Sequence, residues 1–207
     1  MTMRKGVNRA LLAATAAVLA VGFGVSTALA AAGLTVKVSG GGNVTAVSSK
    51  IVLADNGATV TCTSSKMSGA IPNRTTKGSS PVRIGSFRTL SFSGCTGPLG
   101  PVTINGRLPF GLSVDSRTVN GKTDVIFGFS ASLSMTGCSF AVTGSAPGYF
   151  TNSTHILTLT SKLPIPPLEK AQLTIGSVNG CTGLVNNGDH PTYTVKYKFA
   201  HLVIKST

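Results

Sequence analysis

The sequence contains no tryptophan and few groups that titrate near neutral pH. Of its 207 residues, five are Asp or Glu and three are His. The absence of tryptophan excludes a binding site built on an indole ring. The shortage of carboxylates and imidazoles restricts acid–base catalysis and metal binding, because both need several such groups close together.

The few acidic and imidazole groups lie in no recognisable catalytic pattern. A glycosidase needs two facing carboxyl groups; any two of the five could face each other in space, but none lies in a recognisable setting. Zinc sites favour closely spaced His or paired Cys, and neither spacing is present. No Gly-x-Ser-x-Gly nucleophile motif occurs. A polar cluster could hold calcium through oxygen atoms, but a solvent-exposed loop is the simpler interpretation. We therefore expect a non-enzymatic protein and assign no catalytic residue, cofactor or metal ligand. The acidic residues of the chain after the leader are Asp55, Asp115, Asp124, Glu169 and Asp189, the histidines are His155, His190 and His201, and the polar cluster is Asn186, Asn187, Asp189 and His190.

Negative charge is absent between Asp55 and Asp115, where positive charge accumulates. This window predicts contact with an anionic partner, such as a cell-wall polymer or a membrane surface. A merely solubilising surface is the simpler interpretation, and both stay open here. The window has few aromatic residues, so a base-stacking groove for nucleic acid is not indicated. Its candidate contact residues are Lys66, Arg74, Lys77, Arg83, Arg88 and Arg107.

Residues 1–30 have the pattern of a secretion signal. Arg4, Lys5 and Arg9 precede an apolar stretch, and Ala28-Leu29-Ala30 matches a small-residue cleavage site. Cleavage there would lower the formal net charge from +13 to +10 by removing those three cations. An uncleaved membrane anchor is the rival interpretation. We expect one secreted domain over residues 31–207, in the extracellular space or the cell envelope.

Alternation of apolar and polar residues dominates residues 31–207, and no helical periodicity of apolar residues is evident. Residues 125–135 place Val, Phe, Ala, Leu and Met on one face, and residues 192–199 alternate Tyr, Val and Phe with Thr and Lys. Strands of this kind bury one face. Asn120-Gly121 predicts a two-residue type I′ hairpin, because both positions require positive φ. We predict a single-domain, all-β, antiparallel β-sandwich, with a β-barrel as the alternative.

Two segments are predicted to be connections between strands. Residues 64–81 mix Ser, Gly, Pro and Thr with cations, which is typical of a loop. Residues 162–170 contain three prolines and predict a stiff, polyproline-like connector.

The four cysteines predict two disulfides, because an even number of cysteines in an exported chain is typical of a disulfide framework. Three pairings are possible. A weak internal repeat, in which a strand runs into Gly-Cys-Thr-Gly at residues 94–97 and 180–183, favours Cys62–Cys95 and Cys138–Cys181. The domain would then have two related halves with one bridge each. The Gly before three of the cysteines suggests a bulge or a close approach of two backbones.

Four short motifs resemble a group of small secreted, disulfide-containing hypothetical proteins of high-GC Gram-positive bacteria. They are Gly-Cys-Thr-Gly-Pro at 94–98, Leu-Pro-Phe at 108–110, Gly-Tyr-Phe-Thr-Asn-Ser at 148–153 and the Gly-Cys-Thr-Gly segment at 180–189. The resemblance covers most of residues 62–204. It implies secretion, disulfides and a β-fold, and it implies no activity.

Two functions remain. The first is a non-enzymatic extracellular or cell-envelope protein that contacts anionic wall polymers or surfaces. The second is a binding module for a lipid or small apolar ligand, with residues 125–135 and 192–199 lining its interior. An apolar cavity inside a closed barrel would favour the second, and a tightly filled sandwich the first. A secreted toxin or inhibitor is a third class, which a protruding loop at 64–81 would favour.

Overall fold

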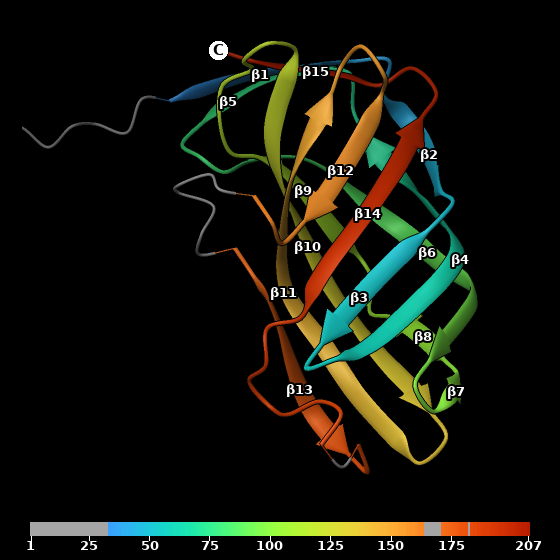
Figure 1. Ribbon diagram of the computed structural model, residues 1–207. Helices are drawn as coiled ribbons and strands as arrows, with labels where there is room; N and C mark the ends of the chain where they lie inside the picture. The colour runs from blue at the N-terminus through green and yellow to red at the C-terminus, as the bar shows by residue number, and fades with distance from the viewer. Residues whose placement is uncertain (1–32, 164–170, 182) are drawn as a thin grey trace, which may run out of the picture. The chain divides into compact units, whose positions relative to one another are not determined.

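The computed structural model describes residues 33–163, 171–181 and 183–207, which form antiparallel β-structure throughout (Figure 1). The predicted signal segment and most of the predicted polyproline connector lie outside the described residues. The strands are β1 (Leu34–Ser39), β2 (Gly42–Ser48), β3 (Ile51–Asp55), β4 (Ala58–Ile71), β5 (Thr75–Gly78), β6 (Val82–Gly97), β7 (Gly100–Pro101), β8 (Thr103–Gly106), β9 (Phe110–Val114), β10 (Lys122–Met135), β11 (Cys138–Thr151), β12 (Ile156–Thr160), β13 (Leu173–Asn179), β14 (Thr192–Phe199) and β15 (Val203–Ser206).

The central feature is a closed barrel of eight strand positions. Strands β11, β12, β14, β2, β4, β6, β9 and β10 pair in that order, and β10 pairs back to β11 to close the ring. Strand β3 continues the β2 position, whereas β13, β8 and β7 are added to the wall. The all-β antiparallel prediction is confirmed, and of the two architectures left open the structure has the barrel rather than the sandwich.

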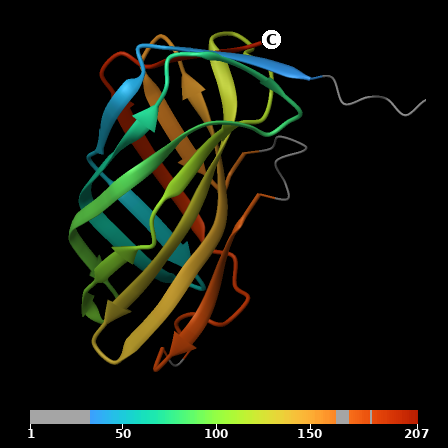
Figure 2. The same cartoon turned by 180° about the vertical axis from the view of Figure 1, so that it is seen from behind.

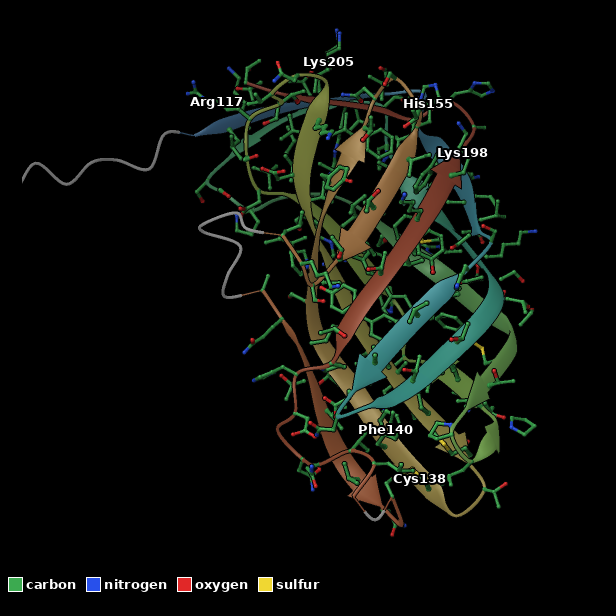
Figure 3. The ribbon with its side chains drawn as sticks, viewed as in Figure 1. Arg117, Cys138, Phe140, His155, Lys198 and Lys205 are labelled. Carbon is green, nitrogen blue, oxygen red and sulfur yellow. A yellow bond between two sulfur atoms is a disulfide. The ribbon has the colours of Figure 1, made fainter. Side chains whose placement is uncertain are left out.

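A second sheet of three strands, in the order β15-β1-β5, covers one end of the barrel (Figures 1 and 2). Its inner side chains Leu34, Val36, Val38 and Ile204 are buried in the same core as the barrel interior. We call this sheet the cap. The end of the barrel that it covers is the cap half. The far half is the other end, where Cys138 and Phe140 lie (Figure 3).

The β2–β3 position contains a bulge at residues 48–50. Val47 pairs with Lys198 of β14, whereas Ile51 pairs with Val195, so four steps on one strand match three on the other. Such an extra residue bends a strand and redirects its side chains. Beyond the bulge, all five residues of β3 are only partly buried.

The prediction that residues 64–81 form a loop is wrong, because most of them belong to strands. Strand β4 continues to Ile71, and β5 follows at Thr75–Gly78. Ser65 and Met67 point inward while Lys66 is exposed, so the alternation of a barrel strand persists through this polar segment. A Cβ at Gly69 would lie 2.2 Å from the carbonyl oxygen of Ser86, which explains the glycine in the middle of this strand. Residues 64–81 therefore do not form the protruding loop that would have favoured a toxin or inhibitor.

The predicted hairpin turn is confirmed. Asn120 and Gly121 have φ values of 50° and 73°, and Val119 and Lys122 exchange both backbone hydrogen bonds. Before the turn, Val119 pairs with Lys122 in one isolated bridge, and residues 117–119 form no strand.

Both predicted disulfides are confirmed, as Cys62–Cys95 and Cys138–Cys181. Cys62 and Cys95 face each other across the β4–β6 ladder. At the second bridge, a Cβ at Gly180 would lie 2.1 Å from the carbonyl oxygen of Gly137. Only glycine allows the two backbones to approach so closely just before the bonded cysteines, as the sequence suggested.

Candidate functional site

The barrel interior contains an apolar cavity of about 80 Å³. Its walls come from strands on all sides of the barrel. Residues 125–135 and 192–199, the two segments expected to line an interior, both contribute. The main lining side chains are Ile51 and Leu53 of β3, Val60 of β4, Leu90 and Phe92 of β6, Ile104 of β8, Phe127, Phe129 and Leu133 of β10, and Tyr193, Val195 and Tyr197 of β14.

The cavity begins where a cluster of phenylalanine rings ends. Phe87 contacts both Phe127 and Phe199 at ring-centroid distances of 5.7 and 6.2 Å, and Phe150 contacts Phe199 at 6.0 Å. These rings fill the cap half, and the side chains of Phe87 and Phe150 are fully buried there. Below the rings, inward-pointing residues such as Leu90 and Phe92 are only partly buried. The packing of the interior is therefore complete in the cap half and incomplete in the far half.

Two seams in the wall border the incompletely packed half. Strand β6 pairs with β9 only over Val82–Phe87, and no ladder joins β6 to β8 in the part of the chain that the structure describes. On the other side, between β13 and β14, β12 ends at Thr160, and β11 is the one strand that forms a ladder with β13 among the described residues. The other edge of β13 is bonded by the loop before β14, since Ile175 donates to the Asp189 carbonyl and accepts from the Gly188 N–H. A second hollow of about 230 Å³ lies beside this second seam. Leu173 and Tyr193 border both the hollow and the cavity.

Two tyrosines line the cavity, and their hydroxyl groups differ in whether they have a hydrogen-bond partner. The Tyr197 hydroxyl lies 2.9 Å from the Ser65 hydroxyl, and both side chains are buried. Burial raises the pKa of Tyr197 to about 12, against a smaller lowering by the Ser65 hydrogen bond. The Tyr193 hydroxyl is buried without a hydrogen-bond partner among the described residues. Burial raises the pKa of Tyr193 as well, so both hydroxyls are protonated at neutral pH.

The six cations of the predicted anionic-partner site are not gathered in one place. Lys66, Arg83, Arg88 and Arg107 are exposed on the barrel, on β4, on β6 and after β8, whereas Arg74 and Lys77 belong to the cap, before and within β5. Arg83 packs along the neighbouring strand, since a Cβ at Gly111 would lie 3.4 Å from its Cζ.

The cap brings together cations that the sequence window missed. Lys37 of β1 and Lys205 of β15 are direct cross-strand neighbours, and both are exposed. Lys77 of β5 pairs with Thr35, two residues from Lys37 on the same face. Arg117 lies at the same end of the barrel as Lys205 (Figure 3). Like charges directly opposite one another destabilise a sheet, so the facing Lys37 and Lys205 are unfavourable to the cap by themselves.

In the polar cluster suggested as a calcium site, the carboxylate of Asp189 accepts hydrogen bonds from neighbouring residues. The Asp189 carboxylate accepts hydrogen bonds from the Asn186 backbone N–H at 2.7 Å and from Asn56 Nδ2 at 2.8 Å. Asp55 lies beside it. Burial, a hydrogen bond with Asp189 and the negative charge of Asp189 raise the pKa of Asp55 to about 6. Among the described residues no group of three or more His, Cys, Asp or Glu side chains is placed to hold a metal.

Comparison of the chain with protein-family models, with curated proteins and with solved structures found no match. The described residues include no helix that is long and apolar enough to cross a membrane.

Proposed function

We propose that this protein is a secreted, non-enzymatic binding protein that holds a small apolar molecule in the far half of its barrel. The observation that carries the proposal is the apolar cavity of about 80 Å³ inside a closed barrel. Barrels of about eight strands have interiors that side chains just fill, or that hold one small ligand. Here the phenylalanine cluster fills one half, and the other half keeps the space.

The volume and the lining of the cavity limit the size and the charge of the ligand. An apolar cavity of about 150 Å³ accommodates benzene in another protein. The smaller cavity here suits a molecule of a few heavy atoms, and a larger one needs partly exposed lining residues such as Leu90 and Phe92 to shift. The described lining contains no carboxylate, imidazole or cation. A neutral ligand is therefore expected, because an unpaired charge would lose its hydration there.

Secretion and the lack of enzymatic activity rest on separate observations. Two disulfides are compatible with an extracellular protein, and residues 1–30 have the pattern of a secretion signal. The Asp55–Asp189 carboxyl pair lies outside the lining of the interior cavity, so the described lining residues offer contacts for binding and no acid–base pair.

The test is a titration of isotope-labelled protein, residues 31–207, with xenon, 2-methyl-1-butene and benzene, followed by NMR. We expect saturable shifts at the lining residues of β3, β6, β10 and β14, and unchanged signals for Leu34, Val36 and Ile204 under the cap. Shifts that do not saturate, or that spread evenly over the surface, would exclude a specific interior site.

A second candidate function is contact with an anionic cell-wall polymer through the cap. The observation that favours it is the facing pair Lys37–Lys205, with Lys77 nearby on the same exposed face. Exposed charges attract a polyanion over a distance that salt shortens to about 10 Å at 0.1 M. The test is retention on isolated cell wall, anionic liposomes and neutral liposomes at low and high salt. Retention on wall that salt reverses supports the candidate, and equal retention on neutral liposomes contradicts it.

A further inference from the structure

The Tyr193 hydroxyl is a buried polar group without a partner. Tyr193 is 8% exposed, and its hydroxyl makes no hydrogen bond among the described residues. Its neighbour on the same face of β14, Tyr197, pairs with Ser65 at 2.9 Å. The two tyrosines thus share a strand, a face and a cavity, and differ in whether the hydroxyl is satisfied.

A buried hydroxyl that has lost its hydration without gaining a partner opposes folding. Phenylalanine would fill the same inner position of β14 without that loss. Among the described residues the two other buried side-chain atoms without partners are Asp115 Oδ2 and Ser206 Oγ, and neither residue borders the cavity. Of these three residues, Tyr193 is therefore the one that lines the cavity.

Tyr193 also borders a second space besides the interior cavity. It borders the interior cavity and the hollow of about 230 Å³ beside the seam between β13 and β14, and Leu173 is the other residue common to both.

We infer that the ligand of this cavity is a small neutral molecule with an apolar body and one hydrogen-bond-accepting oxygen, such as a ketone, to which the Tyr193 hydroxyl donates. The inference rests on the proposed binding function and adds the polar feature that the ligand carries. The phenol keeps its proton at neutral pH because burial raises its pKa. Tyr193 provides selectivity, and the apolar walls provide most of the affinity.

The experiment compares two ligands of the same shape, 2-butanone and 2-methyl-1-butene, in which a carbonyl oxygen replaces a terminal CH₂ group. Dissociation constants are measured by NMR titration for the wild-type chain, Tyr193→Phe and the matched control Tyr197→Phe. We expect Tyr193→Phe to weaken binding of the ketone about fivefold to tenfold, the usual effect of one neutral hydrogen bond, and to leave binding of the alkene unchanged. Tyr197→Phe should leave the ketone-to-alkene affinity ratio as in the wild type. Its melting temperature should fall, because the Ser65 hydroxyl loses its partner.

The outcomes separate this inference from the function on which it rests. If the alkene binds and Tyr193→Phe changes both ligands equally or neither, the inference is overturned and the apolar site stands. If neither ligand binds, the proposed function and the inference both fail. In the unliganded protein, Tyr193→Phe should raise the melting temperature because the unpaired hydroxyl is gone; a clear fall would show that the hydroxyl already has a partner.

Discussion

Tyr193 of β14 lies directly opposite Leu53 of β3 in the barrel wall, and both side chains border the interior cavity. Strand β14 alternates strictly between exposed and buried residues, whereas β3, beyond the bulge at 48–50, is only partly buried throughout. The wall is therefore regular on one strand and loosely packed on its neighbour. The cavity is lined by side chains from both strands at this place.

Filling the cavity should abolish binding without harming the fold. Ala146 of β11 is buried and borders the cavity, so Ala146→Leu places three extra carbon atoms in the available space. The melting temperature should stay the same or rise, and binding of 2-methyl-1-butene should be lost. The matched control is Ala46→Leu, in the filled cap half. There the larger side chain should lower the free energy of unfolding by about 1–3 kcal/mol, the usual cost of overpacking. Equal losses of stability in the two variants would contradict a cavity at Ala146.

The two disulfides should stabilise the protein similarly and affect binding differently. They join residues 33 and 43 positions apart, and the chain-entropy model assigns loops of this length about 3.5–4 kcal/mol each. Denaturant unfolding of Cys62→Ala/Cys95→Ala and of Cys138→Ala/Cys181→Ala should show losses of this order. The first pair should also weaken ligand binding, because Cys62 borders the cavity and the second bridge does not. Equal binding by the two variants would contradict this placement.

The Asp55–Asp189 pair should make stability depend on pH in a defined direction. The pKa of Asp55 is about 6 in the folded protein and 3.8 as an ordinary aspartate. Its protonated form therefore stabilises the fold below about pH 4, and this stabilisation is lost as the pH rises to 6. The Asn side chain of Asp55→Asn does not ionise, so this variant avoids the destabilisation that the wild type suffers as Asp55 becomes charged. Its melting temperature relative to the wild type should therefore rise between pH 4 and 7. We expect about 2 °C or less, because solvent screens the pair.

The partner variant should show the opposite sign. The hydrogen bond from the Asn186 backbone lowers the pKa of Asp189, so the ionised carboxylate stabilises the fold above its ordinary pKa, and this stabilisation is lost in acid. Asp189→Asn should be less stable than the wild type at pH 7 and nearly equal to it at pH 3. Thermal melts at pH 3 to 8 measure both variants, and parallel curves would contradict the assigned contact.

Binding to an anionic wall polymer, if the cap provides it, should depend on the cap lysines. Lys37→Ala/Lys205→Ala should reduce retention on cell wall at low salt several-fold and should slightly raise the melting temperature, because two facing like charges are removed. Lys66→Ala/Arg88→Ala, on the barrel wall, removes the same charge and is the control. Equal losses in both would indicate a response to net charge alone.

The short-range features of the fold were predictable from the sequence. Asn120-Gly121 predicted its hairpin because both residues tolerate positive φ, and the Gly-Cys repeats predicted the disulfide pairing. The inward faces of β10 and β14 followed from strict alternation. In each case a few neighbouring residues contain the physical cause.

Features that depend on distant partners were not predictable. Ser65 occupies an inner position because it pairs with Tyr197, 132 residues away, so β4 has the polar composition of a loop. A sandwich and a barrel require the same alternation, and the choice depends on β10 pairing with both β9 and β11. Lys37 and Lys205 come together only when the two ends of the domain pair in the cap.

The most direct test of the central claim is a crystal structure of residues 31–207 under xenon pressure. The account predicts a xenon atom inside the barrel, in contact with Leu90, Phe129 and Tyr193, and none in the cap half. A far half without xenon, with Leu90 and Phe92 packed across the space, would contradict it.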